Sequence, residues 1–298
     1  MISGEQPNLL RVEGKRWRLL YGEPATGSWN MAVDEAIMLL HARGQSPPTL
    51  RFYQWRPPTV SLGYFQRWDK EVAEEACRRL GIGLVRRPTG GRAVLHDREV
   101  TYSVVIRQEW LPGSILETYR ELSRGLLAGF ELLGVRAEMA TLEKGAGPGF
   151  AGGGRAAGAA CFDSPSWYEL VVDGRKVVGS AQVRREGTIL QHGSILLELD
   201  IDLLLAVLSF PDGEARERTR RILEKKAGSL RPYLGERANF AEVSAAMADG
   251  FKRALGVELV PGELTGEEKR LAQLLMEEKY ARESWLKGMV EKGEGYSR

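Results

Sequence analysis

The chain has 298 residues, with 42 Lys and Arg against 40 Asp and Glu, and a formal net charge of +2. Such a balance argues against the broad basic field of a nucleic-acid-binding protein, so we expect no nucleic-acid partner. The most apolar run, residues 195–210, is interrupted by acidic residues, and the N-terminus has no apolar signal core. We therefore expect a soluble, cytoplasmic protein that does not engage a membrane.

Cysteine and histidine are both rare in this chain. The two cysteines, Cys77 and Cys161, are too few for a disulfide framework and fit a reducing compartment. The three histidines and two cysteines show no zinc spacing, so the sequence predicts no bound metal. Cys77 lies in a segment with helical spacing of apolar residues, which favours a small residue packed near the core.

The first quarter of the chain predicts alternating strands and helices. Apolar residues at helical spacing follow cap-type residues at 26–30 and predict a helix. Pro57-Pro58 separates two β-rich runs, because neither proline fits inside a paired central strand. The predicted elements are strand 16–21, helix 31–43, strands 49–55 and 59–64, and helix 69–80.

Residues 84–106, LVRRPTGGRAVLHDREVTYSVVI, have the pattern of a strand, a tight loop and a second strand. Gly90 and Gly91 permit positive φ or a close backbone approach to a ligand. Arginines surround them, and His96-Asp97 adds an ionisable pair. The segment is a candidate binding loop, although an ordinary hairpin with a charged rim fits the local pattern equally well.

Residues 114–133 predict a helix that ends at Gly134. The glycine- and alanine-rich run 144–160 predicts a mobile loop, because it has few side chains to anchor it. Cys161 follows directly after that run. A thiol at this position is as compatible with a reactive role as with simple packing.

Residues 167–182 predict a hairpin about Asp173-Gly174, a preferred two-residue turn. Counting outward pairs Val171 with Lys176, and regular alternation puts Lys176 on the face of Glu169, Val178 and Ser180. Such a lysine would be partly buried, which disfavours its charged form; composition alone favours a surface lysine instead. The remaining predictions are strand 188–199, containing His192-Gly193, and helices 200–209, 216–226, 240–255 and 266–282.

Cys161 beside a cation would be an activated nucleophile, because positive charge stabilises the thiolate. This chemistry suits acyl transfer through a thioester. His96 or His192 would be the base in a competing Cys-His arrangement. Local sequence places neither the histidines nor Lys176 next to Cys161, so both arrangements remain open at this point.

Four segments resemble motifs of the lipoate/octanoate transfer family, which shares its fold with biotin protein ligases. They are SWNMAVDEAIM at 28–38, RRPTGGRAVLHD at 86–97, GRKVVGSAQ at 174–182 and QHGSILLELD at 191–200. The resemblance implies an α/β (α+β) fold, with a mixed β-sheet flanked by helices and a smaller second sheet. It implies a catalytic domain over 16–255, followed by a helical C-terminal tail over 256–298.

Within this family the chain resembles the LipM-type octanoyltransferases, because Cys161 in ACFDSPSWYEL lies 15 residues ahead of Lys176. The resemblance implies transfer of an octanoyl group from a phosphopantetheine thioester of acyl carrier protein to a lysine of the glycine cleavage H protein or another lipoyl domain. Cys161 would carry the acyl-thioester, Lys176 would lower the thiol pKa, and no separate cofactor would be needed. The implied substrate-binding residues are Arg87, Gly90, Gly91, Arg92, His96, Asp97, Ser180, Gln182, His192 and Gly193.

Three alternatives stay open. An ATP-dependent lipoate-protein ligase would activate a free acid as an acyl-adenylate and would not need Cys161. Its loop usually has three glycines, and here the third position is Arg92, which argues against the ligase. An amidotransferase between lipoyl domains would also use a cysteine, and a non-catalytic binder of acylated carrier domains would form no covalent adduct.

Overall fold

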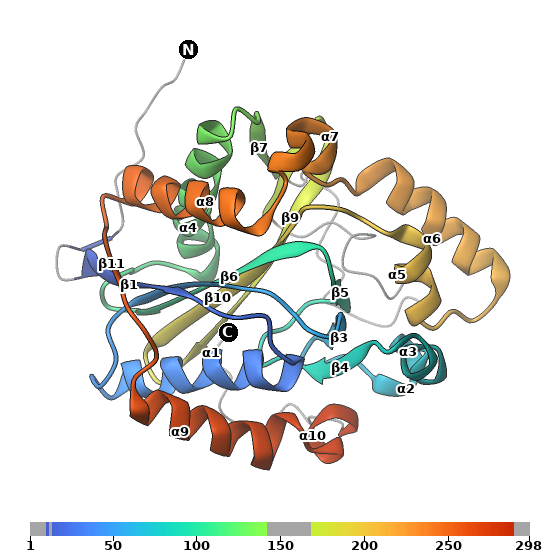
Figure 1. Ribbon diagram of the computed structural model, residues 1–298, viewed down its shortest axis with the longest axis horizontal. Coiled ribbons are helices and arrows are strands. Elements are labelled where there is room, and N and C mark those ends of the chain that lie inside the picture. Colours follow the sequence, from blue (N-terminus) through green and yellow to red (C-terminus); the bar gives the residue numbers. More distant parts are fainter. Residues whose placement is uncertain (1–9, 12–13, 142–167, 289–298) are drawn as a thin grey trace.

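The computed structural model describes residues 10–11, 14–141 and 168–288. Within them a mixed eight-stranded sheet has the order β11-β1-β2-β6-β10-β9-β8-β7, and a small sheet has the order β4-β3-β5 (Figure 1). The β1 strand pairs in parallel with β2 and β11, whereas the centre of the sheet is antiparallel. The strands are β1 Arg16–Tyr21, β2 Thr49–Tyr53, β3 Thr59–Leu62, β4 Gly83–Arg86, β5 Val94–His96, β6 Glu99–Arg107, β7 Ala137–Thr141, β8 Tyr168–Val172, β9 Arg175–Arg185, β10 Thr188–Leu196 and β11 Glu258–Pro261.

Helices cover both faces of the large sheet (Figure 1). On one face, α4 (Ile115–Leu132) and α8 (Phe240–Leu255) pack their apolar sides into the main core. On the other, α1 (Gly27–Ala42) lies between the sheet and α9 (Gly266–Leu275). The shorter elements are α2 Trp68–Glu71, α3 Glu74–Leu80, α5 Ile201–Val207, α6 Gly213–Lys226, α7 Arg231–Leu234 and α10 Glu283–Lys287, with a 3₁₀ turn at Gly235–Arg237 and a π-helical turn at Met276–Tyr280.

The expected fold class and most predicted elements are confirmed. The α4 helix begins at a capping box in which the Ser114 hydroxyl accepts from the backbone N–H of Glu117 and the Glu117 side chain accepts from Ser114 N–H. Among the described residues, no helix is long and apolar enough to cross a membrane.

The predicted helix at 69–80 is wrong in its middle, because the chain breaks it into α2 and α3 at Val72-Ala73. Val72 forms an isolated bridge with Leu208, and Ala73 N–H donates to Val207 O, so tertiary pairing replaces helical hydrogen bonds. Cys77 is fully buried on α3, as predicted, and burial raises the pKa of its thiol to about 11. That thiol is therefore unsuited to nucleophilic chemistry.

The prediction that only helices follow residue 255 is also wrong, because the first element there is a strand. Residues 258–261 form β11, which pairs in parallel with β1 and completes the edge of the large sheet. The helices follow: Glu268 on α9 makes a buried ion pair with Arg18 on β1, 2.6 Å between Oε1 and Nη2. This segment is thus integral to the core that carries β1 and α1.

Candidate functional site

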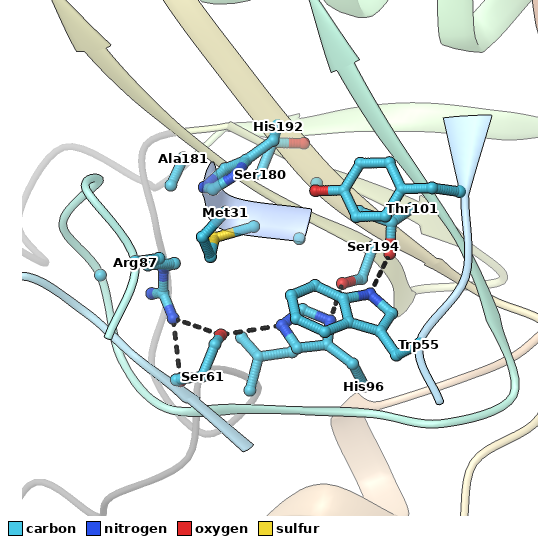
Figure 2. A pocket seen from close by; sticks show the side chains of 15 residues that line it. Met31, Trp55, Ser61, Arg87, His96, Thr101, Ser180, Ala181, His192 and Ser194 are labelled. Atoms are coloured by element: carbon cyan, nitrogen blue, oxygen red, sulfur yellow. Dashed lines mark hydrogen bonds between the residues drawn. The ribbon is translucent and has the colours of Figure 1, made fainter. Parts of the chain in front are cut away.

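A pocket opens where the small sheet meets α1 and the β9–β10 pair (Figure 2). Apolar and polar side chains both contribute to its wall. The lining residues are Met31, Tyr53, Trp55, Ser61, Arg87, Gly91, Val94, His96, Thr101, Gly179, Ser180, Ala181, His192, Gly193 and Ser194. The wall thus includes six of the ten residues implied by the family resemblance to bind substrate, together with Gly179 and Ala181 beside Ser180.

The loop between β4 and β6 is not a simple hairpin, because β4 belongs to the small sheet and β6 to the large one. Val94–His96, predicted as loop, is a third strand that pairs antiparallel with β3. Gly91 has a φ of +94°, which favours glycine. A Cβ on Gly63 would lie 1.9 Å from Gly91 O, so this loop rests directly on the end of β3.

Arg87 holds the glycine loop, the segment that carries Gly90 and Gly91, in place. It is 5% exposed, and its Nη2 donates to the carbonyls of Gly90 at 2.8 Å and Arg92 at 2.7 Å. Its Nη1 donates to Ser61 Oγ at 3.0 Å. These contacts show Arg87 as a scaffold for the loop as well as a residue of the pocket wall.

His96 is tightly fixed at the pocket. Its Nε2 lies 2.8 Å from Ser61 Oγ and its Nδ1 lies 2.8 Å from Glu99 Oε1. The ring stacks on the indole of Trp55, with centroids 4.0 Å apart and planes 10° from parallel. Glu99 Oε1 also accepts from two hydroxyls, those of Thr101 and Ser194.

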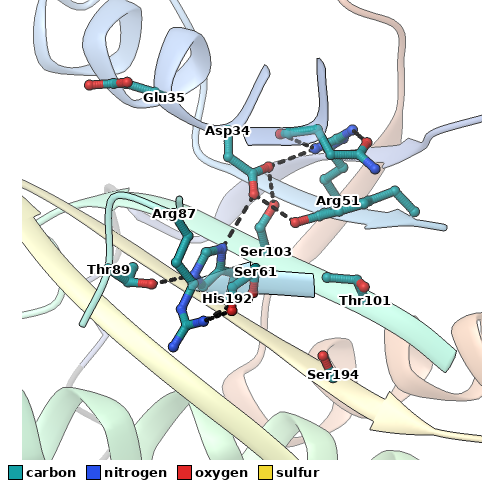
Figure 3. Close-up of polar contacts among 12 residues, drawn as sticks. Asp34, Glu35, Arg51, Ser61, Arg87, Thr89, Thr101, Ser103, His192 and Ser194 are labelled. Atoms are coloured by element: carbon teal, nitrogen blue, oxygen red, sulfur yellow. Dashed lines mark hydrogen bonds and ion pairs between the residues drawn. The ribbon is translucent and has the colours of Figure 1, made fainter. Parts of the chain in front are cut away.

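His192 is held by a second buried network (Figure 3). Its Nε2 lies 2.6 Å from Thr89 Oγ1, and its Nδ1 lies 3.6 Å from Asp34 Oδ2. Burial lowers the pKa of His192, although Asp34 opposes this effect. His192 is accordingly a neutral imidazole near pH 7.

Asp34 is the centre of that network, and sequence reasoning missed it. It is fully buried on α1 and accepts hydrogen bonds from Arg51, Tyr53 and Ser103. Burial alone would raise the pKa of Asp34, but Arg51 and His192 hold it below its ordinary value. Its one sequence signal was an acidic residue inside the apolar stripe of an otherwise amphipathic helix.

Lys176 is buried, at 3% exposure, which contradicts the surface position favoured by composition. Its predicted pairing with Val171 is confirmed, and its Nζ lies 2.7 Å from Glu169 Oε1. The predicted shared face with Glu169 is confirmed by this contact, but the predicted shared face with Val178 and Ser180 is wrong. A register irregularity pairs Val178 with Leu170 and leaves Val177 as an extra residue in β9.

The irregularity changes which side of the sheet Lys176 occupies. Leu170 and Val171 are adjacent and point to opposite faces, so their partners Val178 and Lys176 do so too. Lys176 therefore shares the face of Gly179 and Ala181, which line the pocket. Lys176 lies three residue steps from Gly179 along the strand, at most about 10 Å at the rise of an extended strand.

The other predicted residues divide into two groups. Ser180 and Gly193 line the pocket, and Ser180 Oγ lies 2.8 Å from the Tyr102 hydroxyl. Gln182 instead faces α4, where its Oε1 lies 3.2 Å from Thr118 Oγ1. Asp97 is outside this wall and pairs with Arg98, while burial raises the pKa of Asp97.

Two predictions concern residues that the structure does not describe. Cys161 and the run 144–160 lie in the segment 142–167, outside the described residues, so the proximity of Cys161 to Lys176 stays a prediction. Over the described residues, there is no group of three His, Cys, Asp or Glu side chains that would hold a metal ion.

Comparison with known proteins identifies relatives of this chain. An octanoyltransferase LipM from Kyrpidia tusciae is 54% identical, over 90% of this chain and 97% of that protein. An octanoyltransferase LipM from Symbiobacterium thermophilum is 51% identical, again over 90% and 97%.

Solved structures of lipoate protein ligases are also similar to this chain. A bi-partite lipoate protein ligase from Thermoplasma acidophilum has a TM-score of 0.76 and 27% identity, covering 94% of this chain and 99% of that one. A lipoate-protein ligase A bound with ATP has a TM-score of 0.73 and 28% identity, covering 92% and 100%. Residues 26–252 match the model of the lipoyl protein ligase A/B catalytic domain. The chain therefore belongs to the lipoyl protein ligase A/B catalytic domain family.

Proposed function

We propose that this protein is an acyltransferase of protein lipoylation that moves an octanoyl group to a lysine of a lipoyl domain. The strongest support is the 43–54% identity, over about nine-tenths of the chain, to proteins named octanoyltransferase LipM. The pocket suits the reaction, because it offers an apolar wall from Met31, Trp55 and Val94 beside buried hydrogen-bonding groups.

The donor in this proposal is octanoyl-acyl carrier protein, and the acceptor is the glycine cleavage H protein or another lipoyl domain. The acyl group passes through a thioester on Cys161. A carbonyl that is already activated as a thioester needs no ATP, and the reaction would take place in the cytoplasm. The glycine loop and the arginine that supports it give a rigid floor on which the thioester arm is placed.

Mass spectrometry tests the proposal directly. The protein incubated with octanoyl-acyl carrier protein, without ATP or magnesium, should gain one hydroxylamine-labile octanoyl group that maps to Cys161. Cys161→Ser should lose transfer, because a serine alkoxide forms far less readily than a thiolate. Cys77→Ser is the matched control and should retain transfer. Labelling on Cys77, or no adduct, would contradict the cysteine route.

The ligase alternative has its own support in the 28% identity to a lipoate-protein ligase A that was solved with ATP. It predicts that free octanoate is transferred only when ATP is present, and that Cys161→Ser remains active. Parallel assays with octanoate plus ATP and with octanoyl-acyl carrier protein therefore separate the two functions.

A further inference from the structure

Any transfer to lysine meets a protonation problem. The lysine side chain is an ammonium near neutral pH and has no lone pair for attack until it loses a proton. Lys176, the cation expected beside Cys161, already donates to Glu169 at 2.7 Å. A second group in the pocket is needed to receive the proton.

Ser61, His96 and Glu99 form a chain in which the hydrogen bonds have one direction. Figure 2 shows the contacts that Ser61 makes with Arg87 and His96. Arg87 can only donate, so Ser61 Oγ accepts from Arg87 and its own proton points to His96 Nε2, 2.8 Å away. The Glu99 carboxylate accepts at 2.8 Å, which places the ring proton on His96 Nδ1. Nε2 therefore presents a lone pair toward the Ser61 hydroxyl in the pocket wall.

Charge also favours His96 over His192 as the proton acceptor. Asp34, the carboxylate beside His192, is already neutralised by Arg51 at 2.8 Å. Within the described part of the chain, Glu99 has one ionic partner, His96, and its Oε2 has no hydrogen-bond partner although it is buried. A proton gained by His96 neutralises Glu99, whereas a proton gained by His192 would add uncompensated positive charge.

We infer that His96 is the catalytic base that takes the proton from the acceptor lysine, with Ser61 as the relaying hydroxyl and Glu99 as the positioning residue. This role rests on the proposed transfer to lysine and is independent of which residue carries the acyl group. Trp55 fixes the plane of the imidazole by stacking, and the donors to Glu99 Oε1 fix the carboxylate. The arrangement matches the base-and-orienter geometry of acyl-transfer enzymes.

One ammonium proton passes to His96 Nε2, directly or through the Ser61 hydroxyl, and the neutral amine attacks the thioester carbonyl carbon. A C–N bond forms, and the C–S bond breaks with its electron pair on sulfur. A second proton from the nitrogen ends on that sulfur, and His96 returns its proton to solvent when the amide product leaves.

The test compares two acceptors on the same enzyme. Hydroxylamine is an unprotonated nucleophile near neutral pH, so it needs no base, whereas the lysine of a lipoyl domain does. His96→Gln should slow octanoyl transfer to the lipoyl domain by roughly 10²–10⁴-fold, the usual range for loss of a general base. Its transfer to hydroxylamine, corrected for the uncatalysed reaction, should stay close to the wild-type rate. Added imidazole should partly restore lysine transfer in His96→Gly.

His41→Gln is the matched control, because it removes another buried histidine far along α1 from the pocket wall. It should leave the ratio of the two rates unchanged. Equal losses with both acceptors in His96→Gln would show a merely structural role and overturn the inference. If His96→Gln fails to fold, Glu99→Gln should show the same selective loss, and no selectivity there would also overturn it. If wild-type enzyme octanoylates hydroxylamine but no lipoyl domain, the proposed acceptor fails and the inference fails with it.

Discussion

Lys176 and Glu169 face each other across the β8–β9 hairpin, with Nζ 2.7 Å from Oε1, on the side of the sheet that carries the pocket. The extra residue Val177 produces this arrangement, since without it Lys176 would share the opposite face with Val178. Bulges commonly redirect a side chain next to a functional site. The carboxylate orients the ammonium through this contact.

Replacing Lys176 tests its predicted coupling to Cys161. Lys176→Met should move the pH profile of Cys161 alkylation by iodoacetamide to higher pH and slow acyl-enzyme formation, because a cation that favours the thiolate is lost. Lys176→Arg should keep the profile near that of the wild type. Arg175→Met, which removes the exposed neighbouring cation, is the control. Identical profiles for all four proteins would show that Lys176 and Cys161 are not coupled.

The sequence was most informative where a signal is local. The Asp173-Gly174 turn predicted the hairpin, and helical spacing that ends at Gly134 predicted α4, both close to their observed bounds. Predictions from the sequence failed where contacts between distant segments determine the local structure. Val72 leaves the predicted helix and pairs with Leu208. One unpaired residue in β9 puts Lys176 on the opposite face from Val178. Neither effect has a signature in the residues themselves. The family resemblance indicated which residues belong to one site. Only the fold showed that Asp34 contacts His192 and that Glu99 contacts His96.

Removal of the buried Asp34 carboxylate should be costly. Asp34→Ala leaves Arg51 buried without its 2.8 Å partner, and breaking such a pair typically costs about 3–5 kcal/mol. Urea unfolding of the wild type and the variant measures the difference. Asp69→Ala breaks an exposed pair of similar length, 2.7 Å to Arg67, and should change stability very little. Similar losses in both variants would contradict the importance of burial here.

Stability should fall as the pH drops below about 6.5, the ordinary histidine value. Burial lowers the pKa of both His41 and His192, so the unfolded chain binds protons in this range that the folded chain does not. Their contribution is fully present above the ordinary value and is lost as the pH falls through and below it. Urea unfolding at several pH values from neutral to mildly acidic should show a shallower slope in His41→Gln. An unchanged slope would mean that His41 titrates alike in both states.

Gly63 should tolerate no side chain. A Cβ there would meet Gly91 O at 1.9 Å, so Gly63→Ala must displace the glycine loop or the end of β3. Overpacking of this kind typically costs about 1–3 kcal/mol, and octanoyl transfer should fall because Gly91 lines the pocket. Gly213→Ala places its Cβ in open space on α6 and should preserve both properties. Full activity in Gly63→Ala would show that the loop position does not matter for transfer.

The C-terminal helix should influence the pocket through Arg86. This guanidinium is 1% exposed and donates to backbone carbonyls of both 63–66 and 285–286. In return, the indole of Trp285 donates to Arg86 O at 2.9 Å. Residues 63–66 are thereby held between β4 and α10, and Gly63 within them supports Gly91.

Trp285→Ala should therefore increase amide exchange in 62–67 and lower kcat/KM for octanoyl transfer, although Trp285 lies outside the pocket wall. Trp285→Phe keeps the aromatic packing against Tyr280 and loses only the indole donor, so its effect should be smaller. Leu274→Ala, which truncates an exposed leucine on α9, should leave exchange in 62–67 unaltered. If Trp285→Ala changes global stability without a local rise in exchange, α10 stabilises the fold but does not support the glycine loop.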